Sequence, residues 1–178
     1  MCLRTNQRST HEMTGLISSN KTSIIETQND NRMSTTRNSS PSKIETYLFF
    51  DGRCEEALEF YRRTLGAEIT MMMRYKDSPE PPQPGQCPPK SENKIMHSNI
   101  RIGETTIMAS DGCCSGKPSF QGFSLTISVP TEAEAECLFN ALADGGQVQM
   151  PLSKTFFSPR FGMTADRFGV SWMIMVAA

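Results

Sequence analysis

Residues 44–66 read IETYLFFDGRCEEALEFYRRTLG and hold the pattern from which the rest of the chain is interpreted. The run Ile44–Phe50 is short, apolar and aromatic, which predicts a buried strand. After a turn, Cys54–Leu65 places apolar residues at helical spacing with charged residues on the opposite side. Gly66 follows at the position where glycine often ends a helix. The stretch therefore predicts a strand, a turn and a helix of about three turns.

Three further strands complete this half of the chain. They are predicted at Ile69–Arg74, Lys94–Ile102 and Thr105–Ser110, the last two as a hairpin. The intervening Asp77–Asn93 contains six prolines. That density excludes a helix or a central strand. We expect an exposed loop, which acts either as a lid or as an arm that reaches a partner.

The second half repeats the order of the first. A capping box of Thr131 and Glu134 begins its helix, and a glycine pair ends it. Strands are predicted at Phe123–Val129, Gln147–Met150, Gly162–Ala165 and Val170–Val176. Internal repetition of this kind indicates two copies of one structural unit.

Neither half is large enough to bury both faces of its own sheet. We therefore expect an α+β protein in which two βαβββ modules, 44–114 and 120–177, form a single domain, 44–177. The modules are predicted to build a curved mixed sheet with helices on the convex face and a hollow on the other. Residues 1–43 are polar and lack apolar periodicity, which predicts a disordered extension. Either the native chain starts at Met33 or the extension is a regulatory tail.

Composition excludes several classes of function. The net charge is −1 and the pI is about 6.1, so no general attraction to nucleic acid or an anionic membrane is expected. Apolar runs are far shorter than the roughly 20 residues that span a bilayer, and the N-terminus has no apolar signal region. The six cysteines form no C-x-x-C pair and are expected to be free thiols. These features predict a cytoplasmic protein.

Two stretches resemble the PhnB-like family. The first is Tyr47–Ala67, with its Phe-Tyr and Leu-Gly pairs, and the second is Ser158–Trp172, which ends in Asp-x-Phe-Gly-x-x-Trp. That family belongs to the vicinal oxygen chelate superfamily, with glyoxalase I, fosfomycin- and bleomycin-resistance proteins and extradiol dioxygenases. The resemblance covers residues 44–177. It implies the glyoxalase/bleomycin-resistance fold and a homodimer.

Metal-dependent relatives hold a divalent ion with His or Glu side chains from the first, fourth, fifth and eighth strands. Counting from the shared motifs places these positions at Thr46, Met108, Ser124 and Met173. None of the four carries a carboxylate or an imidazole, and a thioether is too soft for such ions. The resemblance therefore implies that the metal site is absent. We expect no cofactor, and a divalent metal only with non-standard ligands.

Two other polar residues are candidates for a site. His97 alternates with Asn99 and Arg101 along one strand, so the three share a face. His97 is a candidate catalytic or ligand-binding residue, the alternative being a structural or dimer-contact histidine. Arg160 is placed to hold an anionic ligand bidentately over the hollow, unless it is a surface arginine.

Methionine is abundant, and its flexible side chain adapts to varied ligands as well as filling cores. Met108 and Met173, with Phe157 and Trp172, are candidates for a soft apolar pocket.

We therefore expect a PhnB-like protein that binds a small molecule and pairs with itself, without the superfamily metal. The alternative is a lyase, isomerase or transferase-type enzyme that uses His97 or a relocated metal site. Relatives have carried a demethylubiquinone methyltransferase label. No glycine-rich loop follows a strand here to hold a nucleoside cofactor, which disfavours that activity.

Overall fold

The computed structural model describes residues 42–80, 91–112 and 118–177. From Glu45 onwards, these residues belong to one compact unit. The predicted N-terminal extension lies outside the described residues except for its last two positions. So does the greater part of the proline-rich loop, so neither the lid nor the arm is tested. No helix in the described part of the chain is long and apolar enough to cross a membrane.

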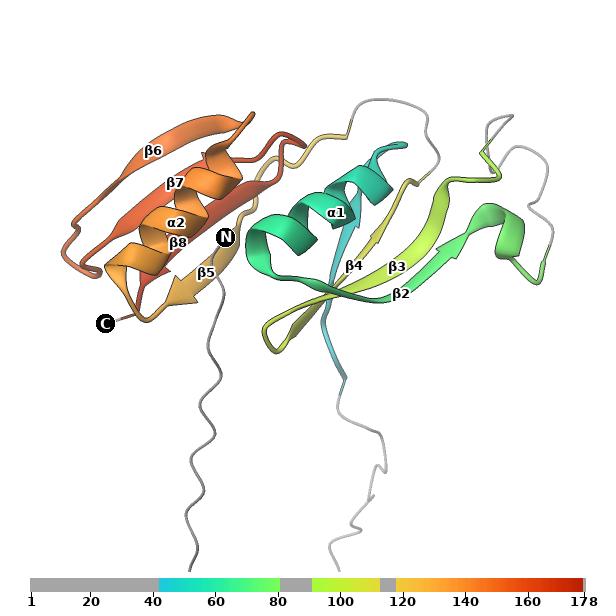
Figure 1. The fold of residues 1–178 in the computed structure, drawn as a ribbon, viewed down its shortest axis with the longest axis horizontal. Coiled ribbons are helices and arrows are strands. Elements are labelled where there is room, and N and C mark those ends of the chain that lie inside the picture. The colour runs from blue at the N-terminus through green and yellow to red at the C-terminus, as the bar shows by residue number, and fades with distance from the viewer. Residues whose placement is uncertain (1–41, 81–90, 113–117, 178) are drawn as a thin grey trace, which may run out of the picture. The chain divides into compact units, whose positions relative to one another are not determined.

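The first module consists of one helix, a short 3-10 helix and four strands (Figure 1). In chain order these are β1 (Thr46–Phe49), α1 (Cys54–Leu65), β2 (Glu68–Arg74), η1 (Tyr75–Asp77), β3 (Ile95–Ile102) and β4 (Thr105–Ser110). The predicted helix bounds agree with those observed, and the strand bounds agree within two residues.

The second module repeats this plan. Its elements are β5 (Leu125–Val129), α2 (Glu132–Ala143), β6 (Gln147–Ser153), β7 (Phe161–Ala165) and β8 (Ser171–Val176). Strand β6 is longer than the predicted Gln147–Met150, because it runs on through Pro151 to Ser153. Proline is tolerated there because β6 is an edge strand.

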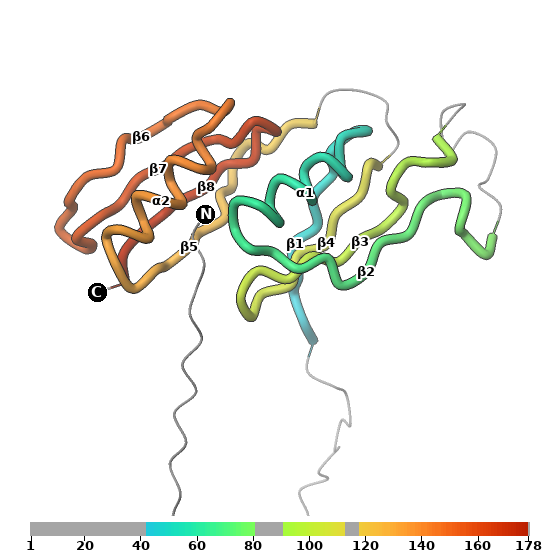
Figure 2. The backbone as a smooth tube through the Cα atoms, in the orientation of Figure 1, coloured from blue at the N-terminus to red at the C-terminus, as the bar shows by residue number. Residues whose placement is uncertain are grey.

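The described strands form two four-stranded sheets of identical topology (Figure 2). The strand orders are β1-β4-β3-β2 and β5-β8-β7-β6. In each sheet the first strand pairs in parallel with the last, and the other ladders are antiparallel. The repeat and the βαβββ modules are therefore confirmed. The sequence predicts one curved sheet, whereas no ladder between described strands joins these two.

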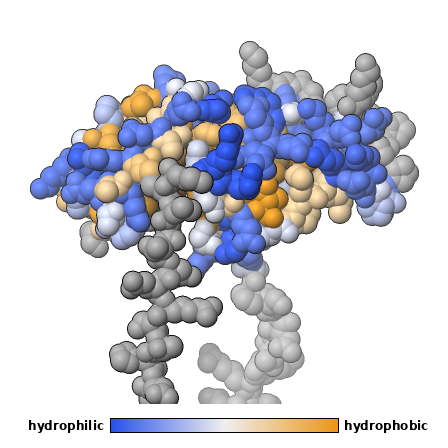
Figure 3. All heavy atoms as spheres, viewed as in Figure 1, coloured by the Kyte–Doolittle hydropathy of each residue, from blue (hydrophilic) through white to orange (hydrophobic). Residues whose placement is uncertain are grey.

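Each helix packs on one face of its own sheet. Alternate residues of a strand point to opposite faces, and in β1 the buried Leu48 lies on the same side as the buried Ala109 of β4. Ala57 and Leu58 of α1 are also buried. Hydrophilic residues cover much of the visible surface in Figure 3, with apolar residues between them. We call the opposite side of each sheet its helix-free face.

Local caps and one long-range hydrogen bond explain where the helices begin and end. The Thr131 hydroxyl accepts a hydrogen bond from the Glu134 N–H at 3.2 Å, as the capping pattern predicts. Helix α1 has no such side-chain cap of its own. Instead the buried Asp111 carboxylate accepts a hydrogen bond from the Cys54 N–H at 2.7 Å. At the other end Gly66 adopts the left-handed conformation, with φ of 63°.

Aromatic rings and one carboxylate connect the two modules. Phe168, in the turn before β8, lies 5.7 Å from the Phe60 ring of α1 and 5.9 Å from the Phe50 ring. Asp166, in the same turn, accepts a hydrogen bond from the Tyr61 hydroxyl at 2.7 Å. Helices α1 and α2 also contact each other. The Asp-x-Phe-Gly turn of the second module is thus buried against the helix of the first.

Among the described cysteines, Cys54 is a free buried thiol. Cys137 is disulfide-bonded. The prediction that all six cysteines are free thiols is therefore wrong at Cys137.

Candidate functional site

The helix-free face of the first sheet brings side chains from all four strands into one row. The ladders place Tyr47 of β1 beside Met108 of β4, and Met108 beside Asn99 of β3. Asn99 is in turn the partner of Met71 on β2. All four residues are half-buried. A polar amide therefore lies between two thioethers, with a phenol at the end of the row.

His97 lies on the same face, two residues before Asn99, as the alternation along this strand predicts. Its partner on β2 is Met73. The Tyr47 hydroxyl and His97 Nδ1 are 3.0 Å apart and share a hydrogen bond. Because β4 separates β1 from β3 in the sheet, these two rings reach towards each other across the strand between them.

An exposed phenylalanine extends this aromatic group. The Phe49 ring stacks on Tyr47 with centroids 4.8 Å apart, and Tyr47 lies 5.6 Å from the imidazole of His97. The Phe49 side chain is 55% exposed. Offset-stacked rings of this kind offer flat area on which a further ring can stack.

Asn99 has an unsatisfied acceptor. Its Oδ1 atom is buried and has no hydrogen-bond partner among the described residues. A buried polar atom without a partner costs roughly 1–3 kcal/mol. Such atoms are uncommon in native structures and require an explanation.

The helix-free face of the second sheet is more polar. Ser171 of β8 donates a hydrogen bond to Gln149 Oε1 at 3.1 Å. Ser124 lies before β5, with its hydroxyl oxygen 2.7 Å from that of Ser171. A serine has one hydroxyl proton, so Ser124 donates to Ser171. The Ser124 oxygen and the Gln149 amide nitrogen keep hydrogen-bonding capacity for another molecule.

The four predicted metal positions do not all lie on the helix-free faces of the two sheets. Thr46 is the ladder partner of the buried Ile107, which places its side chain on the helix side of the first sheet. Met108 lies on the helix-free face. The β1 residue beside Met108 is Tyr47, so the predicted position Thr46 faces the side of the sheet opposite to Met108. In the second module Met173 shares the helix-free face with Ser171, and Ser124 contacts Ser171 there.

The side chains present do not fit a divalent metal. Met108 and Met173 are thioethers, and Tyr47 and Ser124 are neutral hydroxyls, which are poor ligands for Zn²⁺, Ni²⁺ or Mn²⁺. Glu45 precedes Tyr47 by two residues and is a single carboxylate. Within the described ranges no group of three His, Cys, Asp or Glu side chains is placed to hold an ion.

Trp172 does not line a helix-free face. Its side chain is 1% exposed and belongs to the core, where its ring lies 5.5 Å from that of Tyr61. Its Nε1–H donates to Asp166 Oδ2 at 2.8 Å. The other Asp166 oxygen accepts the backbone N–H groups of Phe168 and Val170. The prediction that Trp172 lines a pocket is therefore wrong.

The same carboxylate acts on Tyr61. Burial raises the pKa of the Tyr61 phenol well above its usual value, and the charge of Asp166 raises it further. The phenol therefore stays protonated and donates its hydrogen bond. No local sequence pattern predicts this contact, because the two residues are 105 positions apart.

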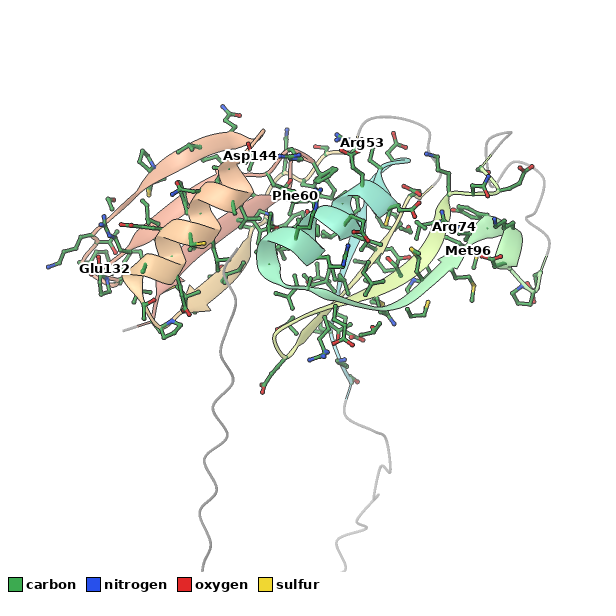
Figure 4. All side chains as sticks on the ribbon, in the orientation of Figure 1. Arg53, Phe60, Arg74, Met96, Glu132 and Asp144 are labelled. Atoms are coloured by element: carbon green, nitrogen blue, oxygen red, sulfur yellow. The ribbon has the colours of Figure 1, made fainter. Side chains whose placement is uncertain are left out.

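Arg160 lies on the helix side of the second sheet. Its guanidinium pairs with Glu132 and Glu136 of α2, at 2.9 and 2.7 Å. Figure 4 labels Glu132 on that helix. The interpretation in which Arg160 reaches over the helix-free face is wrong, because two carboxylates of α2 already hold it.

Phe157 lies in the segment between β6 and β7. It is 41% exposed, and its ring contacts Phe156 and Phe161 at 5.0 and 5.1 Å. Phe161 is the ladder partner of Met175 on β8. This aromatic group therefore lies at the end of β7, and its position does not connect it to Met108 of the other sheet.

Cys54 does not have the properties of a nucleophile. The side chain is fully buried. Burial raises the pKa of its thiol to about 12, and the neighbouring Asp111 charge adds to the effect. A thiol of this kind carries almost no thiolate at neutral pH.

Two βαβββ modules with their helices on one side of each sheet define the glyoxalase/bleomycin-resistance class of fold. A solved glyoxylase/bleomycin resistance protein/dioxygenase domain from Frankia sp. EAN1pec has the same fold. It matches with a TM-score of 0.54 over 79% of this chain and 98% of that chain, at 14% identity. At that identity the likeness establishes the fold alone.

More specific matches define the family. A family model described as 3-demethylubiquinone-9 3-methyltransferase matches residues 42–175. YjdN from Escherichia coli K12 is 37% identical over 138 residues, which are 75% of this chain and 94% of that protein. The solved PhnB protein from Bacillus cereus is 31% identical, with a TM-score of 0.65, over 76% of this chain and all of that chain. The chain belongs to this PhnB-like family of the vicinal oxygen chelate superfamily.

Proposed function

We propose that the protein binds a small molecule on the helix-free face of its first sheet. One observation carries the proposal: Tyr47, His97 and Asn99 form a polar group within an otherwise apolar row, and Asn99 Oδ1 has no partner in the described structure. Small-molecule sites commonly combine apolar area with a few polar groups that fix orientation.

We propose further that this binding does not use the superfamily metal. The argument rests on the donor set, since Met108, Tyr47, Ser124 and Met173 do not match the ligand preference of divalent ions. We do not propose methyl transfer, which is the activity named in the family's description. The homodimer and the cytoplasmic location stay predictions from the sequence and the resemblance.

Native mass spectrometry of the full 178-residue chain, purified without chelator, tests the proposal. We expect a protein mass without a divalent ion, carrying a small organic molecule that is released on denaturation. One divalent ion per chain would contradict the metal-free proposal.

Two neighbouring methionines provide a matched pair of variants. Met71 is the partner of Asn99, whereas Met72 is the partner of Ser98, whose side chain is buried beneath α1. Met71→Lys places a charge on the helix-free face, and Met72→Lys places the same charge on the opposite side. We expect Met71→Lys to lose the bound molecule and Met72→Lys to retain it. Equal retention by both variants would place the ligand elsewhere.

A further inference from the structure

The chemistry of the ligand follows from the groups that surround Asn99. Asn99 Oδ1 is an acceptor without a donor among the described residues. A ligand that supplies an O–H or N–H removes the desolvation cost of this atom, whereas a ligand that supplies only an acceptor does not. The first requirement is therefore a hydrogen-bond donor.

The aromatic residues impose a second requirement. Phe49, Tyr47 and His97 form a continuous series of rings, with centroid separations of 4.8 and 5.6 Å. Tyr47 and His97 are fixed to each other by their hydrogen bond. Ring stacking on fixed aromatic side chains favours flat molecules. The ligand is therefore expected to be planar and aromatic.

Charge imposes a third requirement. Met71 and Met108 are uncharged thioethers. Arg101 is the cation that follows Asn99 on the same face, and its guanidinium already pairs with Glu68. Arg101 is the one Lys or Arg side chain of β3, so no unpaired lysine or arginine of this strand remains to bind an anionic group, which favours an uncharged ligand.

Asn99 Oδ1 is buried, so neighbouring side chains must move before a ligand can donate a hydrogen bond to this atom. Its two ladder partners, Met108 and Met71, are both methionines. Methionine changes rotamer easily and adapts to varied shapes. These side chains are suited to cover the amide in the free protein and to move aside for a ring.

We propose that this face recognises a planar, uncharged aromatic molecule bearing a hydroxyl or N–H group, and that Asn99 accepts the hydrogen bond from that group. The inference rests on the proposed function, because it concerns the same face. It adds the class of ligand and the residue that selects it.

Three naphthalene probes separate the requirements. 2-Naphthol is planar and neutral at pH 7 and has a donor, 2-methoxynaphthalene lacks the donor, and 2-naphthoate is an anion. Equilibrium dialysis against the full-length protein measures the affinity for each. One hydrogen bond corresponds to roughly two- to tenfold in affinity. We expect 2-naphthol to bind tighter than 2-methoxynaphthalene by that factor, and 2-naphthoate to bind most weakly.

Variants test the role of Asn99 itself. Asn99→Leu removes the amide at similar size, and we expect it to reduce the affinity for 2-naphthol to that for 2-methoxynaphthalene. Affinity for 2-methoxynaphthalene itself should be unchanged or increased. Asn140→Leu makes the same change at an exposed position of α2 and should leave all three affinities as they are. Circular dichroism confirms that each variant is folded.

The outcomes distinguish this inference from the proposed function. If no probe binds but native mass spectrometry still finds a bound molecule that Met71→Lys loses, the inferred ligand class is wrong and the proposed function stands. If no bound molecule is found either, the proposed function fails. If the two neutral probes bind equally to the wild-type protein, the face binds rings but the donor requirement is wrong. If 2-naphthoate binds tightest, the charge requirement is wrong. The comparison of probes on the wild-type protein decides these points even if Asn99→Leu does not fold.

Discussion

The hydrogen bond between Tyr61 and Asp166 is expected to be worth more than an ordinary tyrosine hydrogen bond. Tyr61 is 2% exposed and Asp166 is 3% exposed, and their oxygens are 2.7 Å apart. Tyr61→Phe removes only the hydroxyl oxygen. A hydrogen bond to a charged acceptor contributes roughly 1.5–3 kcal/mol. We expect the free energy of unfolding to fall by about that amount.

Tyr75→Phe is the matched control. The Tyr75 hydroxyl donates to the uncharged carbonyl of Gly112 at 2.9 Å, and this tyrosine is half-buried. A neutral hydrogen bond contributes roughly 0.5–1.5 kcal/mol. The same chemical change is therefore expected to cost less at Tyr75 than at Tyr61.

Urea unfolding measures both variants. Trp172 is the one tryptophan of the chain, is buried, and bonds to Asp166, so its fluorescence reports on this region. The midpoint should fall further for Tyr61→Phe than for Tyr75→Phe, with unchanged slopes. If Tyr61→Phe costs no more than Tyr75→Phe, the Asp166 carboxylate does not hold the modules together as argued.

Three further predictions concern packing, titration and surface charge. Gly146→Ala should lower the free energy of unfolding by at least about 2 kcal/mol in the same urea assay, because a Cβ there would lie 2.1 Å from the Ala165 carbonyl oxygen. An unchanged unfolding midpoint would contradict this. Burial raises the pKa of the Cys54 thiol from 9.0 in the unfolded chain to about 12 in the folded protein. The protonated thiol therefore makes its full contribution to the free energy of unfolding below pH 9, and this contribution is lost as the pH rises towards 12. Folded protein should therefore leave Cys54 unmodified by iodoacetamide at pH 8, which peptide mass mapping checks. Arg160→Gln should cost less than about 1 kcal/mol, because its pairs with two glutamates of α2 are partly exposed, and dialysis should find ligand binding unchanged.

The sequence predicts the elements of this fold well because local patterns specify them. The spacing of apolar residues predicts α1 and Gly66 predicts its end, and the repeat of the same order predicts the second module. The alternation of His97 and Asn99 along β3 correctly assigns both to one face. Each of these inferences needs only neighbouring residues.

The errors come from contacts that no local pattern records. The prediction of Thr46 depends on a count from the shared motifs, and a shift of one residue in a strand moves a side chain to the opposite face. Trp172 and Arg160 have partners from other elements, namely Tyr61 and Glu132. The hydrogen bond between Tyr47 and His97 joins residues 50 positions apart. Such pairs are determined by the tertiary fold.

NMR titration of the full-length protein with 2-naphthol shows whether a ligand binds on the helix-free face of the first sheet. The chain has two histidines and one tryptophan, so the imidazole and indole resonances are few, and a His97→Ala variant assigns His97. His97 lies on the helix-free face, whereas Trp172 is buried in the core. We expect the His97 resonance to shift with saturation while the Trp172 indole N–H resonance does not. A shift of the Trp172 resonance with an unchanged His97 resonance would contradict it.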